Sequence, residues 1–457
     1  MTTTASAPPP KTAAPTRKST QRKRLIEGMI AAANRDGYTG ASVSKVIANA
    51  GVSRPTFYDY FEDRDDCFLA VHRDISERLL GHIREAVAEA RPERAPQAAI
   101  RRLIERAEAE PAQAQFIANE AMAGGPRALD ARDGTVLDIE RAIEEARSRA
   151  RPEALSPDLP TRSLIGAAHW LLSQRLRRGE FDLRTFADEL ETWMESYEMP
   201  AGAHRWRTLQ PGPELKPFAY ASDLPADPPP PLPSGRTHLS SAEVAQNQRW
   251  RILFATAATA VSKGYAAATV ADIAAGARVD KRVFYSHFRD KQQAFLAVHE
   301  LAFQQTMAIA ASAYFSADGW PERLWCGIHA ASQFEAGHHD FVRLGYIESH
   351  ALGGAALQRI DDSRRAFTIF LQEGDRYAAQ SDHRDSGSRS RVAMEAIAAA
   401  IAEIGYEQAR HERIKQLPRF VSHATYLCLA PFLGPATAND FVDGQLARER
   451  VEHSLSR

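Results

Sequence analysis

Apolar positions recur along this chain with the period of an α-helix. In residues 161–178, Leu164, Ala168, Leu171 and Leu172 share one face, because positions three or four apart lie on the same side of a helix. The strict alternation that is typical of strands is missing, so we predict an all-α fold. Helices are expected at 65–89, 97–109, 112–123, 133–149, 161–178 and 182–197, and then at 240–263, 290–315, 320–337, 339–352, 355–380, 390–415, 418–432 and from there to about 450.

Residues 42–61 (SVSKVIANAGVSRPTFYDYF) have the pattern of a helix, a tight turn and a second short helix. Ser53 is a suitable cap for the second helix, and Gly51 gives the turn a residue that tolerates a left-handed backbone. Phe57 and Phe61 lie one turn apart, which predicts a buried face. The opposite face then carries donors suited to base edges and phosphate oxygens, namely Arg54, Thr56, Tyr58 and Tyr60.

The same pattern returns at residues 269–288 (TVADIAAGARVDKRVFYSHF), 227 positions further along. A Gly-Tyr pair precedes both copies, and both are followed by Phe-Leu-Ala-Val-His, at 68–72 and 295–299. A repeat of this length indicates duplicated domains. We call residues 42–61 the first reader and residues 269–288 the second reader.

The order of helix, Gly-Tyr, Ser/Thr-Val, helix, turn, short helix with Phe-Tyr-x-x-Phe and long fourth helix resembles the TetR/AcrR family of regulators. Two positions depart from the family pattern. The turn glycine, kept as Gly51, is Arg278 in the second reader, and the small residue usual four positions earlier is Ala274 there but Ile47 in the first. The resemblance implies two tandem TetR-like units, each with a helix-turn-helix DNA-binding domain followed by a helical-bundle ligand and dimerisation domain.

Basic and hydroxyl side chains gather on the outer face of both readers. By resemblance to the family, these positions contact the phosphates and bases of double-stranded DNA. Asp280 takes the place of Ser53 and is expected to be a good cap, although its charge would lie close to the DNA. The expected DNA-binding residues are Ser42, Lys45, Ser53, Arg54, Thr56, Tyr58, Tyr60 and Arg64, and in the second unit Thr269, Lys281, Arg282, Tyr285, His287 and Lys291.

The helical domain of the second unit is rich in aromatic residues, which are expected in a core first and in a pocket second. The resemblance favours a pocket for a small apolar or aromatic ligand, because in this family the ligand lies inside the helical domain. The residues expected to line it are Trp325, Phe334, Tyr346, Phe367 and Tyr406.

The resemblance also implies that 161–178 and 182–197 pack on 390–415 and 418–432, so that one chain forms an intramolecular pseudo-dimer.

Residues 200–240 are rich in proline and lack periodicity, which predicts a linker long enough to connect two units; a proline-rich ligand for a partner is the alternative. The expected domains are a disordered tail (1–16), a first DNA-binding domain (17–66) and helical domain (67–199), the linker (200–240), and a second DNA-binding domain (241–292) and helical domain (293–457).

Composition changes this picture little. The formal net charge is −1, so overall electrostatics do not indicate a nucleic-acid binder, but each reader with its preceding helix is locally cationic. Three cysteines without a framework spacing predict no disulfide. No signal peptide and no apolar run of membrane-spanning length are found, so we expect a cytoplasmic, nucleoid-associated protein without membrane contact.

No nucleophile elbow, phosphate-binding glycine loop or cofactor motif is present, so we expect no enzyme and no cofactor. Cys326, His329, His338, His339 and Asp340 could hold a metal, but an interior thiol and half-exposed histidines explain them as well. We therefore predict a sequence-specific, ligand-responsive transcriptional repressor that reads an asymmetric quasi-palindromic operator. In one alternative only the first reader binds DNA and the second unit is a scaffold or sensor; in another the protein has lost DNA binding and only binds ligands or partners.

Overall fold

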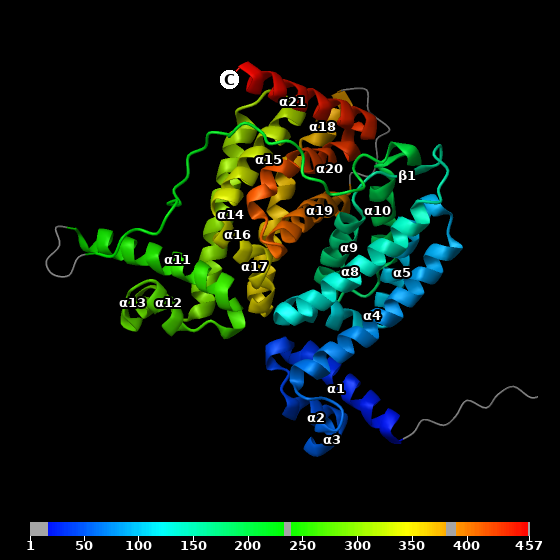
Figure 1. Ribbon diagram of the computed structural model, residues 1–457, viewed down its shortest axis with the longest axis vertical. Helices are drawn as coiled ribbons and strands as arrows, with labels where there is room; N and C mark the ends of the chain where they lie inside the picture. Colours follow the sequence, from blue (N-terminus) through cyan, green and yellow to red (C-terminus); the bar gives the residue numbers. More distant parts are fainter. Residues whose placement is uncertain (1–16, 233–238, 381–389, 456–457) are drawn as a thin grey trace, which may run out of the picture. The chain divides into compact units, whose positions relative to one another are not determined.

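The computed structural model describes residues 17–232, 239–380 and 390–455. The chain divides into two compact units, residues 1–74 and 75–457, whose helices are drawn in Figure 1. The described part is helical apart from one two-stranded sheet, which confirms the predicted all-α class. The expected disordered tail, 1–16, and the loop expected at 381–388 lie outside the described residues.

The first unit contains three helices and the beginning of a fourth. Its core is formed by apolar side chains that the helical period placed on one face, such as Leu25, Val46 and Phe57. Helices α1 and α2 pack so closely that a Cβ on Gly28 would lie 2.7 Å from the carbonyl oxygen of Val46. The elements are α1 (Arg17–Gly40), α2 (Val43–Ala50), α3 (Arg54–Tyr58) and α4 (Arg64–Glu89), which continues into the second unit.

The first half of the second unit is a helical bundle with a short antiparallel sheet, in which Leu155 faces Pro200. The sequence does not predict this sheet, because each strand has only three residues. The elements after α4 are η1 (Pro92–Arg94), α5 (Ala95–Ala109), α6 (Pro111–Gln115), η2 (Phe116–Glu120), α7 (Ala121–Ala123), α8 (Gly125–Arg147), β1 (Leu155–Pro157), α9 (Thr161–Arg177), α10 (Arg184–Glu195), β2 (Glu198–Pro200) and η3 (Ala201–Ala203).

The second half of this unit repeats the order of elements that begins the chain: α11 to α14 correspond to α1 to α4, and they contain the second reader. Its elements are α11 (Ser241–Ala267), α12 (Val270–Gly276), α13 (Lys281–His287), α14 (Lys291–Phe315), α15 (Trp320–Gly337), α16 (His339–Tyr346), η4 (Glu348–Leu352), α17 (Gly354–Ala366), η5 (Phe367–Leu371), α18 (Gly374–Gln380), α19 (Arg391–Arg410), η6 (Ile414–Phe420), α20 (Val421–Leu433) and α21 (Pro435–Leu455).

Helices of the two halves pack directly on each other within the second unit. Helix α9 lies against α19, and α10 also contacts α19. Gly166 of α9 permits the approach, because a Cβ there would lie 2.5 Å from Cγ of Glu403 on α19. The two guanidinium nitrogens of Arg132 on α8 lie 3.2–3.3 Å from the carboxylate oxygens of Glu403, so the contact also contains a buried ion pair.

The proline-rich segment lies between the halves and also packs on the second unit at separate points. We call residues 201–232 the connector. It crosses the second-half helices from the sheet to α11 (Figure 1). The backbone N–H of Gly212 donates to the carbonyl of Arg419, and Nε of Arg419 donates to the carbonyl of Gly212, each at 2.8 Å. The Trp206 ring stacks on Tyr426 with ring centres 4.8 Å apart. The prolines remove backbone donors, so side chains supply part of the contacts that hold this segment.

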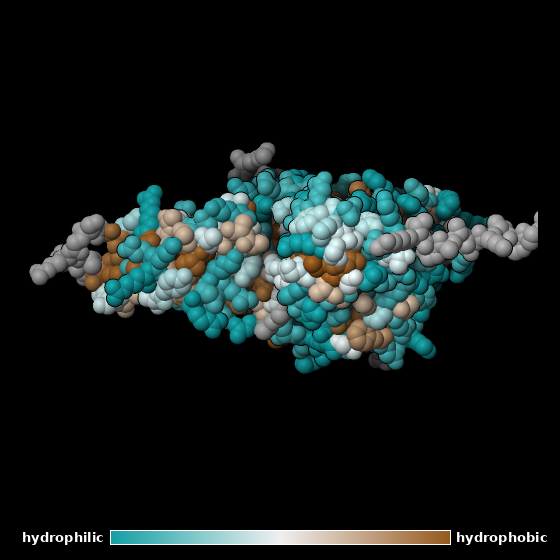
Figure 2. Space-filling model, turned by 90° about the horizontal axis from the view of Figure 1, so that it is seen from below, coloured by the Kyte–Doolittle hydropathy of each residue, from teal (hydrophilic) through white to brown (hydrophobic). Residues whose placement is uncertain are grey.

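The surface is mostly polar. Figure 2 shows a face on which hydrophilic residues cover most of the area and hydrophobic residues form separate patches. Within the described residues, no helix is long and apolar enough to cross a membrane.

Candidate nucleic-acid interfaces and an apolar cavity

The first reader forms the predicted helix-turn-helix. The hydroxyl of Ser42 accepts from the backbone N–H of Lys45 at 3.4 Å, and that of Ser53 from Thr56 at 3.3 Å, so both are N-caps. Gly51 has φ 59° and ψ 43°, the left-handed conformation that glycine adopts without strain. Phe57 is fully buried and fixes the second helix, α3, against the core.

The second reader has the same path with different local chemistry. Thr269 and Asp272 form a capping box at the start of α12. Arg278 takes the place of the turn glycine with φ 51°, as its position predicted. Asp280 stands at the N-cap of α13, but its side chain makes no capping hydrogen bond. The expectation that it would be a good cap is therefore wrong; at this position it contributes only its negative charge.

The strain at Arg278 leads to a first prediction. Replacing Arg278 by glycine is expected to raise the free energy of unfolding by about 1 kcal/mol, because a left-handed backbone costs an L-residue about that much. Urea denaturation of the full chain measures it. Ala275→Gly, at an exposed helical position nearby, is the matched control and is expected to lower stability by about 1 kcal/mol. If Arg278→Gly lowers the free energy of unfolding as Ala275→Gly does, the backbone at Arg278 is not strained.

An arginine from the preceding helix holds the turn of each reader, which sequence reasoning missed. Arg24 donates to the carbonyl of Gly51 at 2.8 Å, and Arg251 donates to that of Arg278 at 2.9 Å. The two arginines are 227 positions apart, like the readers, and this repeat was the signal that could have found them. Because the arginine donates to a backbone carbonyl, it can hold the turn whether the turn residue is glycine or arginine.

Of the nine predicted DNA-binding residues that are exposed, four are the caps Ser42, Ser53 and Thr269 and the paired Lys45, and five remain: Arg54, Tyr58, Lys281, Arg282 and Tyr285. None of these five makes a side-chain hydrogen bond or an ion pair within the described part of the chain. Their donors are therefore available to base edges and phosphates. These side chains are exposed, whereas the phenylalanine of the same helix, Phe57 in α3 or Phe284 in α13, is fully buried.

Other predicted residues are used inside their own domain. The Tyr60 hydroxyl donates to the carbonyl of Lys18 at 3.1 Å, and the corresponding His287 lies 3.5 Å from Oε1 of Gln248; both tie the reader to the helix before it. Thr56 shares a hydroxyl contact with its cap, Ser53, at 2.8 Å. These three side chains position the reading helices.

Arg64 and Lys291, at equivalent places on the fourth helices, hold the Gly-Tyr turns. Arg64 donates to the carbonyl of Tyr38 at 3.3 Å and lies over its ring. Lys291 donates to the carbonyls of Tyr265, Ala266 and Ala268 at 2.8, 3.3 and 2.9 Å. An ammonium group has three donors, so a phosphate would have to compete with these carbonyls for Lys291.

A charge reversal distinguishes the two readers at the start of their first helices. Lys45 pairs with Asp36 at 3.2 Å in the first unit; at the equivalent positions, Asp272 pairs with Lys263 at 2.6 Å. The hydrogen bond from Lys263 is the main cause that lowers the pKa of Asp272 to about 2. The first reader thus places a cation, and the second an anion, where a phosphate would approach the helix N-terminus.

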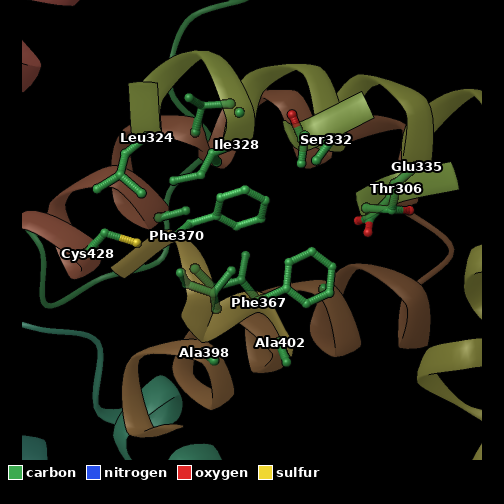
Figure 3. Close-up of a pocket in the computed structure, with 18 of the residues that line it drawn as sticks. Thr306, Leu324, Ile328, Ser332, Glu335, Phe367, Phe370, Ala398, Ala402 and Cys428 are labelled. Atoms are coloured by element: carbon green, nitrogen blue, oxygen red, sulfur yellow. The ribbon is translucent and has the colours of Figure 1, made fainter. Parts of the chain in front are cut away.

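An apolar cavity of about 200 Å³ lies within the second-half bundle. Figure 3 shows Phe367 and Phe370 projecting into it from η5, with Leu324 and Cys428 toward one end and Glu335 and Thr306 toward the other. Two of the residues predicted to line a pocket, Tyr346 and Phe367, line it. The charged groups at this cavity, Glu335 and Arg364, were not predicted, because a charged residue on a helix is ordinarily a solvated one.

The remaining predicted pocket residues lie elsewhere. Trp325 packs in the main hydrophobic core, and Phe334 packs against Tyr220 of the connector with ring centres 6.0 Å apart, so both are core residues and that expectation is corrected. Tyr406 lines a second, polar cavity of about 40 Å³, which we call the polar cavity. Its charged and imidazole lining groups are Arg132, His169, Arg177, His350, Arg364 and Glu403.

The residues considered as metal ligands have other partners. Nδ1 of His338 lies 3.0 Å from the carbonyl of Phe334, and Nδ1 of His339 lies 2.8 Å from Asp340. His329 is buried with its ring edge-on to Phe218. Among the described residues, no group of three His, Cys, Asp or Glu side chains is arranged to hold a metal ion, and the three cysteines are free thiols.

Comparison with known proteins agrees with this geometry. The model of a family described as bacterial regulatory proteins, tetR family, matches residues 25–71 and again residues 252–298, and each match contains one reader. No curated protein matches the chain.

Similar solved structures cover a little over a third of this chain. A tetR-family regulatory protein from Rhodococcus RHA1 is 25% identical, with a TM-score of 0.34, over 39% of this chain and 96% of its own. The transcriptional regulator FadR from Bacillus subtilis, in complex with stearoyl-CoA, is 14% identical with the same TM-score, over 38% of this chain and 97% of its own. The fatty acid degradation regulator FadR from Bacillus halodurans is 17% identical, with a TM-score of 0.34 and the same coverage.

Proposed function

We propose that this protein is a ligand-responsive transcription repressor of the tetR type that reads an operator with two different half-sites, because each of its two readers lies in a segment that the tetR-family model matches. The observation that carries the proposal is the exposed, unpartnered set of donors on each reader: Arg54 and Tyr58 on α3, and Lys281, Arg282 and Tyr285 on α13. A regulator of this kind would act at the chromosome in the cytoplasm and perform no catalysis.

The half-sites should differ because the reading helices differ. Arg54 is followed by Pro55 and Thr56, whereas Lys281 and Arg282 are followed by Val283. An arginine or lysine recognises guanine through its O6 and N7, and an apolar side chain favours a thymine methyl, each contributing about 1–3 kcal/mol of discrimination. One helix therefore presents a single long cation, and the other presents two cations and an apolar group.

Selection of binding sites from random duplexes tests the proposal. The wild-type chain is expected to select an imperfect palindrome; Arg54→Ala should relax specificity in one half only, and Arg282→Ala in the other, each by about 1–3 kcal/mol. Arg141→Ala, an exposed arginine of α8 outside both readers, is the control. Fully symmetric sites would defeat the proposal of two half-sites, and a single selected half would favour the alternative in which the second unit is a scaffold or sensor.

We also propose that one chain forms an intramolecular pseudo-dimer, in which its two halves pack as the two subunits of a homodimer would. The packing of α9 and α10 on α19 and the ion pair of Arg132 with Glu403 support it, because both join the halves of the same chain. In sedimentation at micromolar concentration the 457-residue chain is expected to be a monomer. A compulsory dimer would contradict the pseudo-dimer and leave the proposal on DNA reading intact.

The ligand response is assigned to the apolar cavity. A ligand need only favour the non-binding state of the protein by about 1–3 kcal/mol to change DNA affinity 5- to 150-fold. Release of the selected DNA on addition of cell extract, measured by fluorescence anisotropy, is the expected result, and a chain whose DNA affinity no extract changes would contradict the response.

A further inference from the structure

The guanidinium of Arg364 is a half-buried cation that has no direct ion-pair partner among the described residues. It lines both the apolar cavity and the polar cavity. Within the described residues, its side chain makes no hydrogen bond and no ion pair. Burial lowers the pKa of Arg364 from its ordinary value, which is the response expected of a desolvated and poorly compensated charge.

The nearby carboxylates are already paired with other arginines. Asp361 accepts a hydrogen bond from Arg177 at 2.5 Å, and Glu403 is held by Arg132 at 3.2 Å. Arg132 also pairs with Asp133 at 3.1 Å. Of the three guanidinium groups at the polar cavity, Arg364 is the one that makes no ion pair within the described residues, and it is also the one that faces the apolar cavity.

The other charged group of the apolar cavity can lose its charge. Glu335 receives a hydrogen bond from the Tyr346 hydroxyl at 3.4 Å and has no ion pair among the described residues. Burial raises the pKa of Glu335 to about 7, so this carboxyl takes up a proton readily. An arginine stays protonated in proteins, so Arg364 can be compensated only by an anion.

The size of the cavity limits the body of a ligand. An engineered protein cavity of about 150 Å³ binds benzene, so about 200 Å³ suits a molecule of about eight to ten non-hydrogen atoms. Phe367, Phe370 and Leu324 surround this space (Figure 3) and favour an aromatic or short aliphatic body.

We propose that the apolar cavity binds a small organic acid whose anionic group pairs with Arg364 and whose apolar body lies between Phe367 and Phe370. This inference rests on the proposed ligand response and names the chemical class of that ligand. Next to Arg364, the ion pairs of Arg177 with Asp361 and of Arg132 with Glu403 join the first half of the second unit to its second half. An anion bound at Arg364 changes the charge balance beside both pairs, which gives the ligand a physical connection to the contact between the halves.

The test uses three probes that share a phenyl ring and differ in their polar group, which is a carboxylate, an ammonium or a hydroxyl: phenylacetate, 2-phenylethylamine and 2-phenylethanol. Each is titrated calorimetrically into the full chain. Phenylacetate is expected to bind at least about 10-fold more tightly than the other two, since hydrogen bonds to charged groups are the strong ones. Arg364→Met should weaken phenylacetate by about 10- to 100-fold and change 2-phenylethanol less than about threefold. Hexanoate is a second anionic probe with an aliphatic body.

Stability of the unliganded variants gives a readout that needs no ligand. Arg364→Met removes a half-buried cation that makes no ion pair and is expected to raise the thermal midpoint, whereas Arg132→Met removes a buried, paired cation and is expected to lower it. If Arg364→Met lowers the midpoint as much as Arg132→Met does, Arg364 has a structural partner and the inference is overturned.

The binding results separate the possible failures. If 2-phenylethylamine binds most tightly and Glu335→Gln abolishes its binding, the ligand is a cation held by Glu335. If neither phenylacetate nor hexanoate binds at millimolar concentration, the inference is overturned, even where cell extract releases DNA and the ligand response stands. If phenylacetate binds through Arg364 but no ligand changes DNA affinity, the inference holds and the ligand response fails.

Discussion

Replacing Arg132 by methionine is expected to lower the free energy of unfolding by about 3–5 kcal/mol, because it leaves a buried carboxylate without its partner. Both side chains of the pair are nearly inaccessible, 7% for Arg132 and 9% for Glu403. The guanidinium also lies over the ring of Tyr406, 4.7 Å from its centre. The pair joins α8 to α19, so its loss opens the contact between the two halves. Urea denaturation followed by circular dichroism measures the change.

Two controls distinguish the effect of leaving the Glu403 carboxylate unpaired from other effects of replacing an arginine. Arg141→Met changes an exposed arginine of the same helix, paired with Asp138 at 3.4 Å, and is expected to stay within about 0.5 kcal/mol of wild type. The double variant of Arg132→Met with Glu403→Leu removes both charges and should recover most of the loss. A double variant no more stable than Arg132→Met alone would show that packing, not the orphaned carboxylate, causes the effect.

Replacing Trp206 by alanine is expected to cost about 3–5 kcal/mol, the usual range for a buried tryptophan, and to release the connector. The indole is 3% exposed. It stacks on Tyr426 with an interplanar angle of 16°, meets His423 edge-on, and donates to the side chain of Asn439. The backbone N–H of Trp206 also donates to Asp158 at 3.2 Å. This one residue therefore fixes the beginning of the connector to both halves of the second unit.

Limited trypsin digestion reports the release directly. In the variant we expect faster cleavage after Arg207, while in wild type the packed backbone resists the protease. Phe315→Ala, which removes an aromatic ring that is 72% exposed, is the control and should change neither stability nor cleavage by a measurable amount. Equal cleavage rates in wild type and Trp206→Ala would mean that Trp206 does not hold the connector.

The sequence alone determined the readers, because their signals are local. The caps Ser42 and Ser53, the left-handed turn at Gly51 and Arg278, and the buried Phe57 and Phe284 follow from residues within about twenty positions of one another. The duplication was visible as a repeat of the same letters. An error within the readers concerns Asp280, since whether a suitable residue caps a helix depends on the rotamer of its side chain as well as on its type.

The availability of a side chain was not determined by the sequence. Lys281 and Lys291 are equally basic in the sequence, but the first is exposed and the second gives three donors to the carbonyls around Tyr265. A charge count on a reader cannot distinguish them. The difference arises because the fourth helix returns to the Gly-Tyr turn, which is a tertiary contact.

Only the tertiary structure decided the cavity and the contact between the halves. Aromatic type predicts burial but not which residues face a space, so Trp325 and Phe334 are core residues while Phe367 and Phe370 line the cavity. Arg132 and Glu403 stand 271 positions apart, and Arg364 is left unpaired only because Asp361 and Glu403 have other partners. Pairings at such separations depend on how whole helices pack, and the local pattern of a chain does not encode which side chains that packing brings together.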